Sequence, residues 1–286
     1  MRRGRTELPG ERMLGWAEWG PEHGTPVLFC PGAGTSRHLG FGADVLDELA
    51  IRLISLDRPG LGASDPDPGR TLLSWAADVD AFAEREQLGE FGIVANSQGT
   101  PFALACAAAG IGTAVAAAAI GDELAHPAVI GLLEPDVRAM VDAVAADPDG
   151  FAASFAERAD ARTLAELTVT MSSETDRRVY TDPAFAPHYR RALEEGFAQG
   201  PGGYVRDLVL TMSRWPFDPA KITVPVDLWY GERDTSPVHS PDRGAFLARR
   251  IPSARRTVLP DAGGAIVWTH AREILGSLKE SWRSAG

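Results

Sequence analysis

Residues 92–99 read GIVANSQG. The first half of this stretch is short and apolar, which is typical of a strand buried on both faces of a parallel sheet. Ser97 follows at once, with the small residues Ala95 and Gly99 two positions away on either side. Small side chains relieve the close approach of two backbones where a strand turns directly into a helix, and such a turn presents the serine hydroxyl above the sheet. The stretch therefore predicts a strand, a strained turn with Ser97 at its tip, and a helix immediately after it.

The same rhythm extends along the chain. Other short apolar runs that are bounded by turn residues predict further buried strands, at 26–30, 52–57, 115–121, 224–231 and 256–260. Amphipathic or apolar helical patterns separate them, at 71–89, 100–110 and 270–282. This alternation predicts a doubly wound, mostly parallel α/β sheet. Residues 14–20 are predicted to add an N-terminal hairpin strand.

One region interrupts the alternation. Between about Asp122 and Ile222 the sequence contains amphipathic helical stretches broken by Pro and Gly, and no convincing strand. We therefore predict an α/β core formed by residues 1–122 and 222–286, and a helical cap formed by residues 123–221.

Composition limits the classes of function. The 286 residues carry a net charge of −11, which argues against a nucleic acid or an anionic membrane as partner. The N-terminal basic residues are not followed by an apolar stretch, so no signal peptide is predicted and the expected compartment is the cytoplasm. The two cysteines, Cys30 and Cys106, lie in apolar surroundings and are predicted to be buried thiols. The sequence leaves open whether the chain forms a homodimer.

The turn at Ser97 resembles the nucleophile elbow of the α/β-hydrolase superfamily, and three other segments match that family in order. They are PGAG (31–34), DRPGLGASDP (57–66) and GERD (231–234). The resemblance implies that Ser97 is the nucleophile and that Asp234 is the acid of a catalytic triad. It also implies that the backbone N–H groups of Ala33 and Gln98 form the oxyanion hole. Many members carry histidine where this chain has Pro31.

The histidine of the triad is missing from its usual place. The family order is Ser, acid, His, with the histidine just after the last strand. Here that loop reads LPDAGGAIVWTH, and the expected position falls on Gly264 or Ala265. Neither residue can accept a proton from a serine. Three explanations stand open: an engineered loss, a natural loss, or a base supplied from elsewhere.

The chain has six histidines that could replace it. We expect His38, which follows the PGAG segment, to face the substrate together with Asn96. His126 and His188 belong to the helical insertion and could reach down to the pocket. His270 is expected at the start of the last helix, and His23 and His239 are expected in surface loops.

The leading hypothesis is a hydrolase that cleaves a small, largely apolar ester, lactone or thioester through an acyl-serine at Ser97. The alternative is a non-hydrolytic protein on the same fold, either a lyase or cyclase or a ligand-binding protein, or an inactivated mutant of a hydrolase. Asp122, which ends the strand before the insertion, is a second position at which some members carry the acid. No metal site, P-loop or complete dinucleotide motif is present in the sequence, so no cofactor is predicted.

Overall fold

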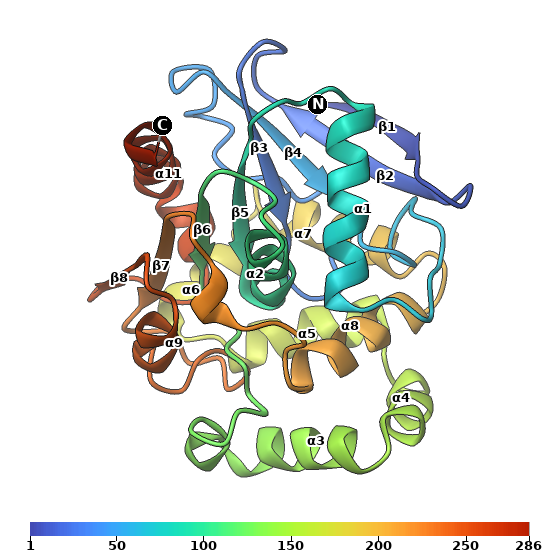
Figure 1. The fold of residues 1–286 in the computed structure, drawn as a ribbon. Helices are drawn as coiled ribbons and strands as arrows, with labels where there is room; N and C mark the ends of the chain where they lie inside the picture. The colour runs from blue at the N-terminus through green and yellow to red at the C-terminus, as the bar shows by residue number, and fades with distance from the viewer. Residues whose placement is uncertain (286) are drawn as a thin grey trace.

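We describe residues 1–285 of the chain in a computed structural model (Figure 1). One sheet of eight strands runs through the molecule in the order β1-β2-β4-β3-β5-β6-β7-β8. Strands β3 to β8 pair in parallel, whereas β1 pairs with β2 and β2 with β4 in antiparallel fashion. The strands are β1 (Arg2–Glu7), β2 (Met13–Trp19), β3 (Thr25–Cys30), β4 (Ile51–Leu56), β5 (Gly92–Asn96), β6 (Val115–Ala118), β7 (Val226–Gly231) and β8 (Ala254–Leu259). The doubly wound, mostly parallel sheet is thus confirmed, and β1 is a strand that we did not predict.

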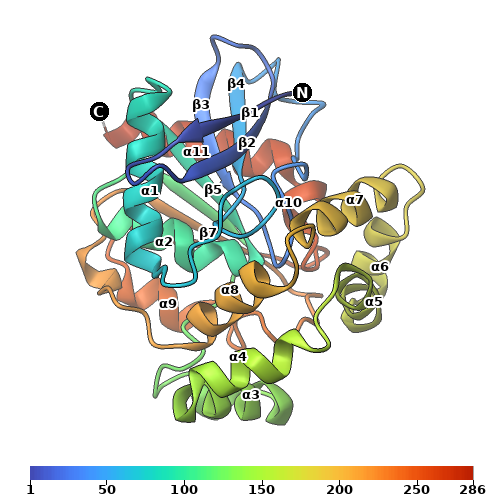
Figure 2. The same cartoon turned by 90° about the vertical axis from the view of Figure 1, so that its right-hand side faces the viewer.

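Helices cover both faces of the sheet (Figure 2). One face carries α1 (Leu72–Arg85), α2 (Thr100–Ala108) and α9 (Ala245–Arg250), and the opposite face carries α10 (Ile266–Thr269) and α11 (Ala271–Ala285). Helix α1 begins with a capping box in which the Thr71 side chain accepts from Ser74 N–H, and it buries Trp75 completely. These two layers give the sheet a separate hydrophobic core on each face.

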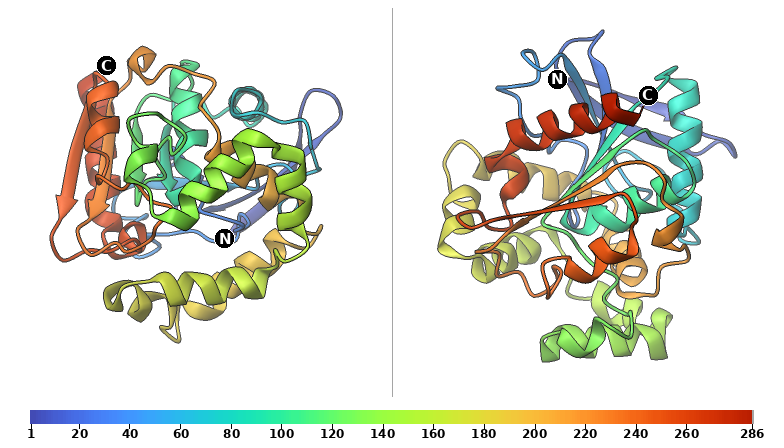
Figure 3. Two further views of the ribbon diagram at one scale, coloured as in Figure 1. Left: turned by 90° about the horizontal axis from the view of Figure 1, so that it is seen from below. Right: turned by 60° about the vertical axis from the view of Figure 1, so that its left-hand side comes forward.

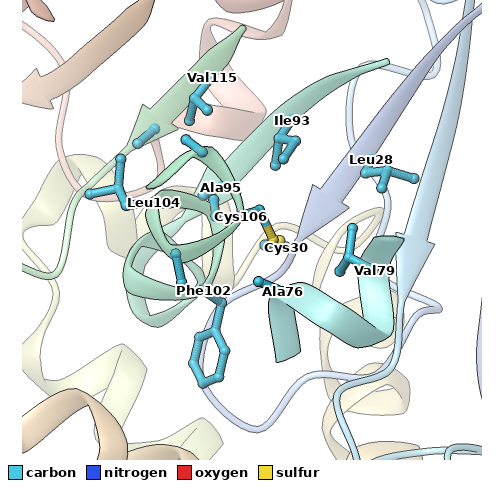
Figure 4. Close-up of a cluster of buried hydrophobic side chains, with 14 of the residues drawn as sticks. Leu28, Cys30, Ala76, Val79, Ile93, Ala95, Phe102, Leu104, Cys106 and Val115 are labelled. Carbon is cyan, nitrogen blue, oxygen red and sulfur yellow. The ribbon is translucent and has the colours of Figure 1, made fainter. Parts of the chain in front are cut away.

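The core under α2 contains both cysteines (Figure 4). Cys30 ends β3 and Cys106 lies on α2; both are free and fully buried, as predicted. Burial raises the pKa of Cys30 to about 12 and raises that of Cys106 well above its ordinary value. Neither thiol is suited to act as a nucleophile.

A helical insertion connects β6 to β7 and gathers at one end of the sheet (Figure 1). Its helices are α3 (Pro135–Ala146), α4 (Pro148–Ala156), α5 (Ala161–Met171), α6 (Glu174–Tyr180), α7 (Ala186–Gly196) and α8 (Gly202–Met212). Figure 3 shows two groups, α3 with α4 and α5 with α6 and α7. The first group packs in an apolar cluster together with α8, and the second packs in another cluster together with Leu39 and Trp268 of the core. Three single-turn 3₁₀ helices complete the description, at Ser97–Gly99, Ile130–Leu132 and Pro219–Lys221. In the part of the chain described here, no helix combines the length and the apolarity of a transmembrane span.

Candidate active site

The Ser97 turn has the strained geometry that its sequence predicts. Ser97 follows β5 directly and adopts φ of 50°, a left-handed conformation that is uncommon for a residue other than glycine. A side chain at position 99 would collide with the carbonyl oxygen of Cys30 at the end of β3. Only glycine therefore allows the start of α2 to pass so close to the neighbouring strand.

An imidazole lies against the Ser97 hydroxyl, and it belongs to His239. Ser97 Oγ is 2.7 Å from His239 Nε2, and His239 Nδ1 is 2.6 Å from Asp234 Oδ2. Asp234 and His239 both lie in the loop that follows β7, five positions apart. The expectation that His239 is merely a surface residue is therefore wrong: only 12% of its side chain is exposed, and the ring points into the site.

The charges of this pair stabilise each other. Burial disfavours a protonated ring, but the negative charge of Asp234 and its hydrogen bond outweigh burial and raise the pKa of His239. Burial likewise opposes the charge of Asp234, and the interactions with His239 outweigh it and lower the pKa of that carboxyl. Asp234 therefore stays ionised and holds the ring with Nε2 directed at the serine.

The loop that carries His239 is anchored to the end of β6. The backbone N–H of Ser240 donates to the carbonyl of Ile120 at 2.9 Å, and its hydroxyl donates to Asp122 Oδ2 at 2.9 Å. Asp122 also accepts from the N–H of Glu123. Burial raises the pKa of Asp122. Asp122 thus supports the loop and makes no hydrogen bond to His239, so the acid partner of the ring is Asp234.

The expected histidine position lies beside Asp234 but is filled differently. A Cβ atom at Gly264 would stand 2.9 Å from Asp234 Oδ1, so a side chain there would face the acid. Instead the N–H groups of Gly264 and Ala265 donate to the carboxylate of Asp176, at 2.8 and 2.9 Å. Asp176 comes from α6 of the insertion, and we did not predict its role. Among the three explanations for the missing histidine, this arrangement favours a base supplied from elsewhere.

The remaining histidines lie away from the serine. His38 does not line the cavity, contrary to our expectation; its Nε2 is 2.7 Å from Glu195 Oε2 on α7. His126 packs against Phe246, and His23 and His188 are exposed. His270 lies at the junction of α10 and α11 and contacts the Thr269 hydroxyl.

A cavity of about 680 Å³ opens beside Ser97, between the sheet and the insertion. Ala33, Asn96 and Gln98 line it together with Ser97 and His239, which places the predicted oxyanion residues and Asn96 at the cavity wall. Six large side chains of the insertion line the cavity: Phe155, Met171, Tyr180, Tyr189, Tyr204 and Met212. Its surface is therefore mainly apolar, and polar groups lie both at the serine and on the insertion, where Glu134 and Asp136 belong to the lining.

A buried arginine holds the loop at 31–34, which lies beside Ser97. Arg58, from the DRPGLGASDP stretch, donates to the carbonyls of Pro31 and Gly32 at 2.7 and 3.0 Å. Its Nε also donates to Asp207 of α8, at 2.7 Å. This stretch therefore fixes the loop that carries Ala33 and links it to the insertion.

Most of the chain matches a known protein family. The sequence profile of the alpha/beta hydrolase family matches residues 27–274. The chain belongs to the alpha/beta hydrolase family. No curated protein sequence is significantly similar to it.

Solved structures of alpha/beta hydrolases share the fold at low sequence identity. A bromoperoxidase from Bacillus anthracis has a TM-score of 0.74 at 18% identity, covering 99% of this chain and 100% of that one. An enol-lactonase from Burkholderia xenovorans has 0.70 at 18%, with 97% and 99% covered. A thermophilic esterase from Thermogutta terrifontis has 0.67 at 22%, with 100% and 99% covered. At these identities the likeness establishes the fold, and the chemistry rests on the site.

Within residues 1–285, no group of three or more His, Cys, Asp or Glu side chains is placed to hold a metal ion.

Proposed function

We propose that this alpha/beta hydrolase cleaves small, largely apolar carboxylic esters, including lactones and thioesters, through an acyl-serine at Ser97. The observation that carries the proposal is the chain of short contacts from Ser97 Oγ to His239 Nε2 and from His239 Nδ1 to Asp234 Oδ2. The imidazole against the serine supports hydrolysis over the two alternatives, a non-hydrolytic protein and an inactivated mutant. Esterases and an enol-lactonase among the structural neighbours agree with this chemistry.

The reaction follows from the roles of the three side chains. His239 Nε2 accepts the Ser97 proton as Oγ attacks the carbonyl carbon, and Asp234 stabilises the imidazolium through Nδ1–H. The N–H groups of Ala33 and Gln98 hold the oxyanion. The imidazolium then protonates the leaving alcohol or thiol as its bond to the acyl carbon breaks. A water molecule, deprotonated by His239, releases the acid and restores Ser97.

The charge of the cavity favours an uncharged acyl group. Among the described residues, its lining contains no lysine or arginine. It contains five carboxyl side chains, those of Asp122, Glu134, Asp136, Asp176 and Asp234. A carboxylate on the substrate would lie near these negative charges without a cation to pair with. Such an unpaired charge is costly in an apolar cavity. We therefore expect 4-nitrophenyl hexanoate to be cleaved at least tenfold more efficiently, as kcat/KM, than mono-4-nitrophenyl adipate, which has the same chain length.

The test compares three variants. Ser97→Ala and His239→Ala should each lower kcat by about 10⁴-fold or more, as removal of a triad member does in serine hydrolases. His188→Ala, which removes an exposed histidine of the insertion, is the matched control and should retain kcat within twofold. A fluorophosphonate should attach to Ser97 in the parent protein and in the control.

Two results would refute the proposal. One is a folded His239→Ala variant, verified by circular dichroism, with kcat within tenfold of the parent. The other is a fluorophosphonate adduct on a residue other than Ser97, located by peptide mass spectrometry.

A further inference from the structure

Asp176 is a buried carboxylate from the insertion that reaches into the α/β core. It lies on α6 and is 3% exposed. Its oxygens accept from the N–H groups of Gly264 and Ala265, and Oδ2 also lies 3.1 Å from the Ser173 hydroxyl. Among the described residues it forms no ion pair with a lysine or arginine. A buried carboxylate is costly to desolvate, and the hydrogen bonds from the N–H groups of the 263–265 turn compensate this cost.

The 263–265 turn is wedged between two carboxylates. A Cβ atom at Gly263 would collide with the oxygens of Asp176, and a Cβ atom at Gly264 would stand 2.9 Å from Asp234 Oδ1. Glycine at both positions therefore leaves the room that the two carboxylates occupy. The absence of a histidine from this turn and the presence of Asp176 go together for this reason. Displacement of Asp176 would free the turn to move against Asp234, which holds His239.

Asp176 also interacts electrostatically with His239. It lines the same cavity as the ring, and its negative charge adds to that of Asp234 in favouring the protonated imidazole. The groups around the ring are the Ser97 hydroxyl at Nε2, Asp234 at Nδ1, and Asp176 from the insertion. The Tyr180 phenol lies near both carboxylates; burial raises its pKa well above the ordinary value, so it stays neutral.

We propose that Asp176 is a positioning residue through which the helical insertion completes the active site. It holds the glycine turn against Asp234 and places a second negative charge beside His239, where positive charge develops when the serine gives up its proton. Hydrolysis then depends on α6 being docked on the core. This inference rests on the proposed function.

The decisive variant is Asp176→Asn, which keeps the shape of the side chain and removes its charge. We expect kcat for 4-nitrophenyl hexanoate to fall by about 10- to 100-fold with KM changed less than threefold, since misplacement of a catalytic group acts on the reacting step. The acid limb of the pH profile should move to lower pH, because loss of a nearby negative charge lowers the pKa of His239. Glu174→Gln is the matched control: it removes an exposed carboxylate from the same helix and should change neither quantity.

A second readout does not need activity. Titration of the His239 ring by NMR, assigned with the His239→Gln variant, should show its midpoint at lower pH in Asp176→Asn than in the parent. If the parent proves not to hydrolyse esters, this titration still tests whether Asp176 acts on the ring. A folded Asp176→Asn variant with parental kcat and an unmoved titration overturns the inference even if Ser97 and His239 prove essential.

A conservative variant covers the case in which Asp176→Asn does not fold. Asp176→Glu keeps the charge and lengthens the side chain, so it should displace the 263–265 turn. We expect a near-parental His239 titration together with a reduced kcat. A parental kcat in Asp176→Glu would overturn the positioning role.

Discussion

The buried contact between the insertion and the loop at 31–34 offers the sharpest test of how the site is held together. Asp207 of α8 is fully buried and accepts from Arg58 and Arg70, whose side chains are 0% and 2% exposed. Arg58 also holds the carbonyls of Pro31 and Gly32. We consider the substitution Asp207→Asn, which preserves shape and removes the carboxylate charge that pairs with both guanidinium groups.

The magnitude follows from burial. Breaking a buried ion pair by removal of one partner costs about 3–5 kcal/mol, because the remaining charge stays desolvated. Here two cations lose their partner, although carbonyl oxygens still solvate them in part, so we expect a loss in this range. For a chain of this size that corresponds to a fall in melting temperature of roughly 6–20 °C. Since Arg58 positions the loop that carries Ala33, kcat should also fall by about tenfold or more under conditions where the variant is folded.

The assay is urea unfolding followed by fluorescence and circular dichroism, with kcat measured well below the unfolding midpoint. The control is Glu166→Gln, which breaks the exposed Arg162–Glu166 pair, whose side chains are 87% and 64% exposed. That change should stay within about 0.5 kcal/mol, since exposed pairs contribute little. A loss below 1 kcal/mol for Asp207→Asn, with parental kcat, would refute the view that this buried network holds the loop.

Three further outcomes are expected. The acid limb of the kcat/KM profile should have an apparent pKa above the ordinary histidine value of about 6.5. Asp234 and Asp176 raise the pKa of His239, and only the neutral ring accepts the serine proton. An acid limb with an apparent pKa below about 6 would contradict this. Gly264→His should lower kcat and stability, with overpacking worth about 1–3 kcal/mol, because its side chain must fit beside Asp234; a gain in kcat would show that the turn can instead carry the base. Cys30 and Cys106 should fail to react with a thiol reagent at pH 8 in the native protein and both should react in guanidinium chloride; rapid native labelling would show that the core under α2 opens readily.

Local features of the chain determined the strands, the turn and the acid. The short apolar run followed by a serine between small residues predicted β5 and its tight turn, and the GERD segment placed Asp234 just after β7. β1 was missed because RRGRTE is mostly charged: it is an edge strand whose only neighbour is β2, so its side chains need not be apolar.

Only the tertiary structure decided which histidine meets the serine. Asp234 and His239 are five residues apart in a loop, and the path of that loop depends on contacts from Ser240 to Ile120 and Asp122, more than a hundred positions earlier in the chain. The docking of Asp176 on the 263–265 turn and of His38 on Glu195 likewise depends on how the insertion folds back over the core. Sequence spacing specifies local backbone geometry, whereas the reach of an imidazole across a cavity depends on the packing of distant segments.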